Sequence, residues 1–169
     1  MMDESVLYPQ LIKDLSAIFV LDDRSVHGPA HWMRVRANGL TLARHTGANT
    51  RVVELFSVFH DSCRENDWTD PDRGPRAAAL AGYFFYEEKM LLCSEDELQL
   101  LVYACGGHTY GGISDDPTIG TCWDADRLDL PRAGIMVDPN LLCTDAAKDA
   151  NLIHWAESRA FDWRGKVRL

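Results

Sequence analysis

The sequence predicts an all-α protein, a single-domain helical bundle, and three observations support this. Apolar residues recur at three- to four-residue spacing in most segments, and helix-capping residues or prolines stand before them. No convincing set of strands and no internal repeat is present. The length of 169 residues is usual for one domain and sufficient for a hydrophobic core. We therefore expect one domain over 1–169, with short connections and two longer loops.

The first three helices are predicted from their spacing and their first residues. A first amphipathic helix is expected over 8–21, and a second begins at Gly28-Pro29, because proline is favoured in a first helical turn, and runs to Gly47. Asn49 can cap a third helix, whose apolar run 52–59 is suited to a deep core position. This third helix ends at a His-Asp pair.

The second half of the chain is predicted to hold four more helices. After a polar, turn-rich loop, a helix is expected over 76–92. Ser94 and the acids that follow it are a strong signal for the start of the next helix. A glycine-rich loop then leads through Pro117 to a helix expected over 119–128, and a last helix is expected over 144–161.

Charge and composition exclude several partners. The formal net charge is −9, so the overall field repels nucleic-acid polymers and anionic membrane surfaces, but a small phosphorylated substrate is still allowed. The N-terminus resembles no signal peptide and no apolar run is long enough to span a membrane, which predicts a cytoplasmic protein. The five cysteines form no C-x-x-C pair, which argues against a zinc ribbon or a disulfide framework.

Histidines and acids stand at the beginnings and ends of the predicted helices. His31 lies early in the second helix, His60 and Asp61 end the third, and Asp126 lies in a late one. Imidazole and carboxylate ligands together suit manganese, iron, cobalt, nickel or zinc. Taken singly, each of these histidines is more often structural than a ligand, so spacing alone does not establish a metal site.

The order of these residues adds to the argument. The series H-x-x-x-H-W-x-R-V, F-H-D-S, G-G-H and D-A-D-R-L-D resembles the HD-domain superfamily of metal-dependent phosphohydrolases. The resemblance covers about 27–129 and leaves 130–169 as a C-terminal extension. It implies the family's helical bundle, in agreement with the independent prediction above.

The resemblance also implies a set of metal ligands. Carried over by position, these are His31, His60, Asp61 and Asp126, which would hold one divalent ion, manganese, magnesium, cobalt, nickel, iron or zinc. Asp124 is the alternative to Asp126, because both lie in the same motif. Asp126 is preferred since the family's ligand commonly follows alanine, and the two acids point to different helix faces.

Further residues are implied as catalytic or substrate-binding. The proton acceptor would be Asp61 or Glu65, and His108 would point toward the reacting water or substrate. Three residues are expected to contact the substrate phosphate: His27, Arg34 and Arg64. Arg34 shares a helix face with the first ligand, so it can reach either a ligating carboxylate or a phosphate oxygen. Relatives with a glutamate at the position of Arg64 use it to place water, so this departure leaves the general base open.

The expected function is metal-dependent hydrolysis of a phosphate ester or anhydride in a small molecule, and a nucleotide is the substrate expected first. Two alternatives are kept. One is a non-catalytic HD-type module that binds a nucleotide or a protein partner, and the other is a diiron oxygenase on the same bundle. The oligomeric state is left open.

Overall fold

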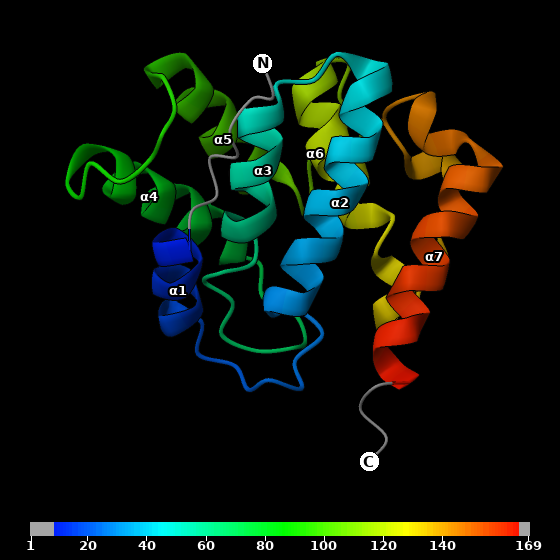
Figure 1. The fold of residues 1–169 in the computed structure, drawn as a ribbon, viewed down its shortest axis with the longest axis horizontal. Coiled ribbons are helices and arrows are strands. Elements are labelled where there is room, and N and C mark those ends of the chain that lie inside the picture. The colour runs from blue at the N-terminus through cyan, green and yellow to red at the C-terminus, as the bar shows by residue number, and fades with distance from the viewer. Residues whose placement is uncertain (1–8, 166–169) are drawn as a thin grey trace.

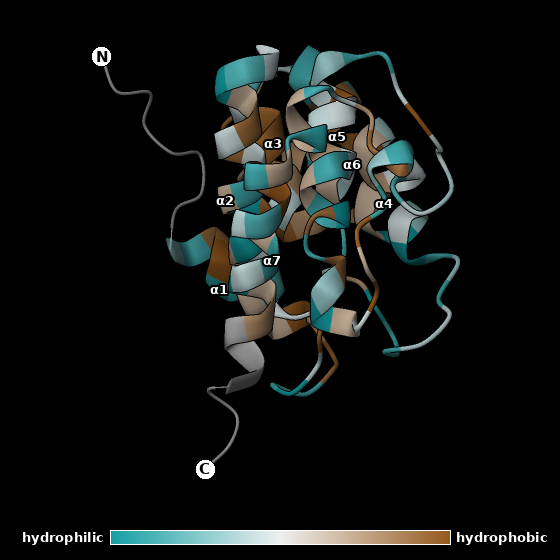
Figure 2. Cartoon of the chain, turned by 90° about the vertical axis from the view of Figure 1, so that its right-hand side faces the viewer, coloured by the Kyte–Doolittle hydropathy of each residue, from teal (hydrophilic) through white to brown (hydrophobic). Residues whose placement is uncertain are grey.

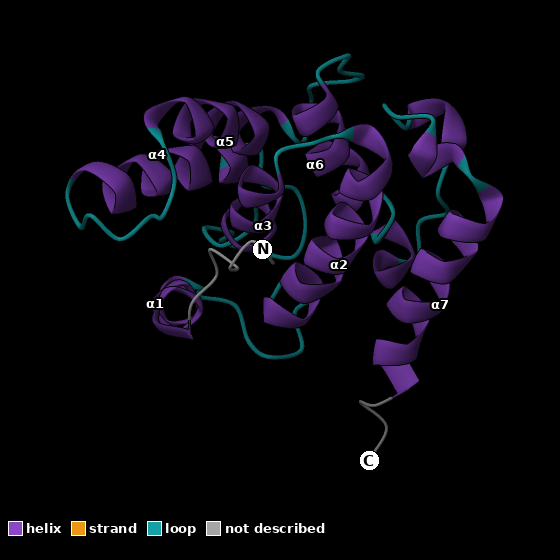
Figure 3. Cartoon of the chain, turned by 45° about the horizontal axis from the view of Figure 1, so that its top comes forward, coloured by secondary structure: helices purple, strands orange, loops and turns teal. Residues whose placement is uncertain are grey.

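The computed structural model describes residues 9–165, and within this part the chain is all-α, as predicted (Figures 1 and 3). Seven α-helices and three short 3-10 helices are present, and no strand occurs among the described residues. Their bounds are α1 Pro9–Ile18, α2 Pro29–Thr46, α3 Thr50–Phe59, α4 Arg73–Tyr86, α5 Glu95–Gly107, α6 Pro117–Arg127, η1 Leu130–Ala133, η2 Pro139–Leu141, η3 Ala146–Lys148 and α7 Ala150–Gly165.

Helix α3 is the centre of the bundle. Every residue from Val52 to Phe59 is buried, so this helix is enclosed by its neighbours α2, α4, α5 and α6. In Figure 2 it is coloured as hydrophobic among outer elements that carry more hydrophilic residues. The residue at the end of this enclosed helix, His60, is polar and fully buried. A buried polar side chain costs free energy unless it is hydrogen-bonded or binds a ligand.

The helix beginnings are fixed by the capping residues that the sequence indicated. The Asn49 side chain accepts the backbone N–H groups of Arg51 and Val52 at the start of α3. Ser94 and Glu97 form a reciprocal capping box at the start of α5. These caps fix where α3 and α5 begin, and therefore where their other ends, at His60 and His108, are placed.

Several predicted boundaries differ from the structure. Helix α6 runs over Pro117–Arg127 and not over 119–128, because the Asp116 side chain caps it and Pro117 occupies its first turn. Helix α1 ends at Ile18 and does not reach 21, and the predicted first residue, 8, lies outside the described part. Helix α4 runs over Arg73–Tyr86 and not over 76–92, since Lys89 takes a positive φ of 55° that a helix does not accommodate.

The largest difference is at the C-terminal extension. A helix from 144 was predicted, but η3 occupies this region and α7 begins at Ala150. The Asp124 carboxylate accepts hydrogen bonds from the backbone N–H of Cys143 and Thr144, which pulls this segment onto α6. Asp149 then caps α7, because its side chain accepts hydrogen bonds from the backbone N–H groups of Asn151 and Leu152.

A second group of buried apolar residues attaches the extension to α2 and α6. Its members are Leu42, Leu128, Leu142, Ala147 and Ala156. The extension is therefore packed against the helices that carry the sequence motifs, and the single domain over 1–169 stays a prediction. None of the described helices has the length and apolar character needed to cross a membrane.

A glycine inside α2 allows α2 and α3 to approach closely. A Cβ atom built on Gly39 would lie 2.4 Å from the Val53 Cγ1 atom, and Val53 is a buried, stiff β-branched side chain. We expect Gly39→Ala to lower the free energy of unfolding by about 1–3 kcal/mol through overpacking. Urea denaturation measures this free energy.

Gly82 in α4 is the matched control, because a Cβ there meets nothing within 4 Å. Gly82→Ala should leave stability unchanged or raise it by up to about 1 kcal/mol. Equal stability of both variants would contradict the packing argument.

Candidate metal centre

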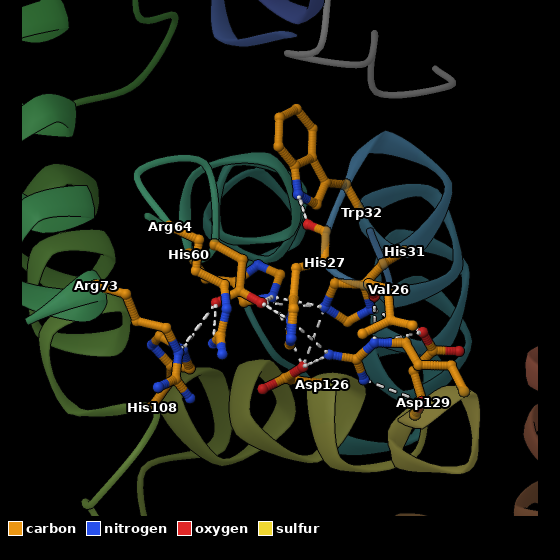
Figure 4. A network of polar contacts seen from close by, with 12 residues as sticks. Val26, His27, His31, Trp32, His60, Arg64, Arg73, His108, Asp126 and Asp129 are labelled. Atoms are coloured by element: carbon orange, nitrogen blue, oxygen red, sulfur yellow. Dashed lines mark hydrogen bonds and ion pairs between the residues drawn. The ribbon is translucent and has the colours of Figure 1, made fainter. Parts of the chain in front are cut away.

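Four helix ends meet at one place and carry the polar side chains drawn in Figure 4. His31 lies in the first turn of α2, His60 is the C-cap of α3, His108 is the C-cap of α5, and Asp126 lies in the last turn of α6. Asp61 follows the end of α3. Each of these residues except Asp126 is buried, and Asp126 retains 16% exposure of its side chain.

Three ligand atoms from three helices lie close enough to share one ion. The Nε2 atoms of His31 and His60 are 3.0 Å apart, and Asp126 Oδ1 lies 3.3 Å from the first and 3.6 Å from the second. Donor atoms placed at about 2.0–2.2 Å from one ion, as in zinc sites, are separated from each other by roughly 3 to 3.5 Å. The triad His31, His60 and Asp126 therefore has the spacing of metal ligands.

The opposite ring nitrogen of each histidine is held by an acceptor. His31 Nδ1 donates to Asp129 Oδ2 at 2.7 Å, and His60 Nδ1 lies 3.1 Å from the carbonyl oxygens of both Phe56 and Ser57. A proton on Nδ1 leaves the Nε2 lone pair free, which is the tautomer a metal ligand needs. The two Nε2 atoms face each other at 3.0 Å, a contact that is satisfied either by a proton on one of them or by a cation bound to both, so the donor set fits a divalent metal ion.

Asp61 lies between this triad and a second group of donors. Its Oδ2 atom is 3.8 Å from His31 Nε2 and 3.9 Å from His60 Nε2, and it accepts a 2.8 Å hydrogen bond from His27 Nδ1. Both distances to the imidazoles are longer than those of Asp126 Oδ1, and Asp61 is not among the residues whose ligand atoms all lie within 4.8 Å of one another, so its place as a fourth ligand stays a prediction.

The other oxygen of Asp61 faces three donors without a well-aligned hydrogen bond. Oδ1 lies 3.1 Å from Arg73 Nε, 3.6 Å from His108 Nε2 and 3.7 Å from Arg64 Nη1. Asp61 Oδ1, Arg73 Nε, His108 Nε2 and Asp126 Oδ1 are all buried without a hydrogen-bond partner. Buried polar atoms that lack partners are costly, so their convergence here indicates a site that binds a ligand, an ion or water.

The electrostatics of the cluster favour a positive charge among the carboxylates. Burial opposes ionisation of Asp61, but the charge of His60, the nearby His108 imidazole and a hydrogen bond from His27 hold the pKa of this carboxyl well below its usual range. Burial also lowers the pKa of His60, yet the negative charges of Asp61 and Asp126 outweigh it and raise that pKa. For His31, burial and then Arg132 lower the pKa, so its imidazole stays neutral.

Asp129 holds His31 and is itself held by two arginines. Arg34 donates to both carboxylate oxygens, from Nε at 2.8 Å and from Nη2 at 3.0 Å. Arg132 places Nε 3.7 Å from Asp129 Oδ2, and its Nη2 lies 3.9 Å from Asp126 Oδ1. Arg132 is fixed in turn by a 2.7 Å bond from Nε to the Val26 carbonyl. The orientation of the first histidine is thus determined by a buried ionic network.

Comparison with solved structures decides the fold. A crystal structure of a "predicted HD superfamily hydrolase" from an uncultured Thermotogales bacterium superposes with a TM-score of 0.71 and 17% sequence identity, and the match covers 98% of this chain and 93% of the other. This chain has the HD-domain fold. The fold implied by the sequence motifs is therefore confirmed. No protein-family model matches the chain. No curated protein matches it either.

In this HD-fold chain, Asp126 and not Asp124 reaches the histidines. Asp124 is fully buried and its two oxygens accept three hydrogen bonds, from the backbone N–H of Cys143 and Thr144 and from the Thr144 hydroxyl. The structure therefore gives Asp124 an anchoring role. His60 and Asp61 are also brought together with His31, as the HD motif implied.

Glu65 is not brought to the cluster. Its side chain is 67% exposed, and the Oε1 atom lies 3.8 Å from Arg76 Nε on the outer surface. The chain turns at 60–64 after α3 ends, which sends Asp61 inward and Glu65 outward. Of the two predicted proton acceptors, the geometry supports Asp61 alone.

The predicted phosphate contacts have different surroundings. Arg64 faces Asp61 as described, while its Nε and Nη2 donate to the loop carbonyls of Asn66 and Trp68. His27 is directed at Asp61. Arg34 donates to Asp129, a carboxylate that is not one of the predicted ligands, so its predicted contact with a ligating carboxylate or a phosphate oxygen stays a prediction.

Sequence reasoning missed Arg73, Asp129 and Arg132. One signal was present for Asp129: it follows Asp126 by three residues, as Arg34 follows His31, so both pairs share the spacing that puts side chains on one side of a helical turn. Arg73 had no such signal. It is placed by Gly74, where a Cβ would lie 2.5 Å from the Cys105 carbonyl oxygen, so only glycine lets α4 begin against the end of α5.

Proposed function

We propose that this protein is a metal-dependent phosphohydrolase acting on a small phosphorylated molecule. The observation that carries this proposal is the triad of His31, His60 and Asp126, whose ligand atoms all lie within 4.8 Å of one another at the junction of three helices. The structural neighbour, described as a predicted HD superfamily hydrolase, supports hydrolysis as the reaction. The buried arginines around Asp61 support a phosphoryl group as the target.

The site would hold one divalent ion through His31, His60, Asp126 and Asp61. When bound there, such an ion supplies activation of a water molecule and polarisation of a phosphoryl oxygen. Mixed nitrogen and oxygen ligands suit manganese, iron, cobalt, nickel or zinc, and magnesium is kept as a further candidate.

Asp61 is the proton acceptor in this proposal. It is buried, and its carboxyl is held ionised by His60, by the nearby His108 imidazole and by a hydrogen bond from His27. It lies between the ligand triad on one side and Arg64, Arg73 and His108 on the other. A base must lie within hydrogen-bond reach of the water it deprotonates, and Asp61 lies at the junction of the two groups, where such a water would be bound.

Arg64, Arg73 and His108 would stabilise the negative charge that develops on the phosphoryl oxygens. Their facing atoms lie 3.1–3.7 Å from Asp61 Oδ1, and those of Arg73 and His108 lack a hydrogen-bond partner. Donors fixed in a buried site before the reaction stabilise developing charge more strongly than donors in water. Arg34 and His27 would act by positioning: Arg34 through Asp129, and His27 through Asp61.

The buried cluster also bears on the non-catalytic alternative. A module that only binds a partner does not need four buried polar atoms without a hydrogen bond at its helix junction, because burying such atoms costs free energy that ion pairs or a bound ligand must offset. Within the proposal, a nucleotide is the substrate class that we expect first.

The test is phosphate and pyrophosphate release from a panel of nucleotides and sugar phosphates. Metal-stripped protein is resupplied separately with Mn²⁺, Mg²⁺, Co²⁺, Ni²⁺, Fe²⁺ and Zn²⁺. We expect turnover that depends on the metal and is lost in His60→Gln, with folding checked by circular dichroism. His45→Gln is the matched control, since His45 is exposed on α2 away from the cluster, and should retain turnover. Metal-bound protein that hydrolyses nothing on the panel would contradict the proposal; two bound irons and an oxygen-dependent reaction would favour the oxygenase instead.

A further inference from the structure

The last helix, α7, is joined to two helices of the metal centre through one buried amide. Helix α7 packs beside α2 (Figure 1). Arg159 in α7 donates from Nη1 to Asn38 Oδ1 at 3.0 Å, and Asn38 is a residue of α2 that is only 1% exposed. Its Nδ2 atom donates to the carbonyl oxygen of Ala125 at 3.0 Å, and Ala125 directly precedes Asp126 in α6. Asn38 therefore connects α7, α2 and α6.

The Ala125 carbonyl accepts this bond because α6 ends here. The last carbonyl groups of an α-helix have no partner within the helix. In a continued helix the Ala125 carbonyl would accept the N–H of Asp129, but that N–H donates to the Asp126 carbonyl at 3.0 Å. Asn38 supplies the hydrogen bond instead, so the backbone immediately before Asp126 is held by a side chain from α2.

The ligand atom of Asp126 depends on this backbone. In the triad, His31 Nδ1 is held by Asp129 at 2.7 Å, and His60 Nδ1 lies 3.1 Å from two carbonyl oxygens. Asp126 Oδ1 is buried and makes no hydrogen bond. Its position is therefore set largely by the last turn of α6, to which Ala125 belongs.

One side of α2 contacts the whole segment that carries Asp126. His31, Arg34 and Asn38 follow one another at spacings of three and four residues, so they share one side of the helix. The first two bond to Asp129 and the third bonds to Ala125. The side of α2 that carries the first ligand therefore also holds the turn that carries the last one.

Arg159 is itself held in place within α7. Its Cζ atom lies 4.5 Å from the centroid of the Trp155 ring, which is four residues earlier in the helix. Ala156 and Ala160 are buried, so this side of α7 faces the bundle. A guanidinium group only donates hydrogen bonds, so it fixes the Asn38 amide with the oxygen toward α7 and the nitrogen toward α6.

We infer that Arg159 and Asn38 are positioning residues of the metal centre. The chain of hydrogen bonds from Arg159 through Asn38 to Ala125 holds the last turn of α6 so that Asp126 Oδ1 faces the other two ligands of the triad. This inference rests on the proposed function, because it takes the triad as the metal site. It also gives the C-terminal extension, which lies outside the motif series, a part in forming the site.

Titration of metal-stripped protein with Co²⁺, followed by the visible absorbance of the bound ion, reports both the affinity and the ligand geometry. Asn38→Leu keeps a branched side chain and removes both hydrogen bonds. We expect it to weaken Co²⁺ binding by about tenfold, the lower end of the range for residues that orient metal ligands, and to change the absorption spectrum at saturating Co²⁺.

Thr121→Val is the matched control. Thr121 is fully buried in α6, and its hydroxyl lies 2.8 Å from the hydroxyl of Thr46, the last residue of α2. It therefore joins the same two helices at the end of α2 that is opposite to His31. We expect this variant to lower the urea midpoint of unfolding and to keep the Co²⁺ affinity and spectrum of the wild type. Equal weakening of Co²⁺ binding in Thr121→Val and Asn38→Leu would overturn the inference, because general loosening of the helix pair would explain both.

Two substitutions of Arg159 separate the hydrogen bond from the charge. Loss of a nearby positive charge by itself strengthens the binding of a cation, whereas loss of the hydrogen-bond chain weakens it. We expect Arg159→Met to weaken Co²⁺ binding by about threefold or more, and Arg159→Lys, which keeps a donor, to stay within about twofold of the wild type. Because Arg159 is only partly buried, these variants test the inference even if Asn38→Leu does not fold.

The outcomes distinguish this inference from the proposed function. Wild-type affinity and spectrum in Asn38→Leu, or tighter Co²⁺ binding in Arg159→Met, would overturn the inference and leave the phosphohydrolase standing. Weakened binding in both variants, with no phosphate hydrolysed by the wild type under any metal, would support the inference and contradict the phosphohydrolase. A wild-type protein that binds no Co²⁺ would overturn the metal centre and the inference together.

Discussion

Asp61→Asn is expected to lower turnover by about 10²- to 10⁴-fold, the range associated with loss of a general base. The substitution keeps the shape of the side chain but removes the negative charge that faces Arg64 and Arg73 at 3.7 and 3.1 Å. Because both guanidinium groups are largely buried, we also expect a loss of stability of about 3–5 kcal/mol. The measurements are kcat at saturating metal and the urea midpoint of unfolding.

Glu65→Gln is the matched control for Asp61. The Glu65 side chain is 67% exposed and has its contact with Arg76 on the outer surface, so we expect kcat to stay within about twofold of the wild type and stability within about 0.5 kcal/mol. A large loss of turnover in Glu65→Gln with little loss in Asp61→Asn would exchange the two roles and contradict the assignment of the proton acceptor.

Asp129→Asn is expected to weaken metal binding by about 10- to 100-fold, as removal of an orienting carboxylate does at other metal sites. Asp129 accepts the Nδ1 proton of His31 at 2.7 Å, so the substitution disturbs the tautomer and the orientation of the Nε2 ligand atom. Arg34 loses its ionic partner at the same time. Metal affinity is measured by titration of the metal-stripped protein with Co²⁺.

Excess metal separates positioning from catalysis in this variant. If Asp129 acts through His31, turnover of Asp129→Asn returns toward the wild-type value as the metal concentration rises above the weakened Kd. Asp124→Asn supplies the comparison, since Asp124 anchors Cys143 and Thr144: it should lower the unfolding free energy while metal affinity stays unchanged. Turnover of Asp129→Asn that stays low at saturating metal would contradict the positioning role.

The parts of the fold that the sequence predicted are those set by local chemistry. Asn49 and Ser94 mark the starts of α3 and α5 because side-chain capping acts within a few residues. Asp116 and Pro117 act in the same way at the start of α6, although that helix was predicted from 119. The start of the last helix was misplaced since Asp124, about twenty residues away in the chain, determines the path of Cys143 and Thr144. No local pattern around 144 contains that information.

The same division applies to the site. His31, His60, Asp61 and Asp126 were expected together because an ordered motif places each of them at a helix end. Arg73 and Arg132 were not expected, since their positions depend on how α4 and η1 pack against the junction. Arg73 is placed by the close approach at Gly74, and Arg132 by a bond to the Val26 carbonyl 106 positions away.

The count of tightly bound metal ions per chain tests the central claim most directly. Purified protein is stripped, incubated with Mn²⁺ or Co²⁺, passed through a desalting column and analysed by mass spectrometry for metal, in parallel with Asp126→Asn and Asp124→Asn. The two variants differ by the same chemical change at acids two positions apart, of which only Asp126 lies within 4 Å of His31 and His60. We expect one ion per chain in the wild type and in Asp124→Asn, and none in Asp126→Asn. A wild-type protein that retains no ion, or an Asp126→Asn variant that retains as much as the wild type, would contradict the account.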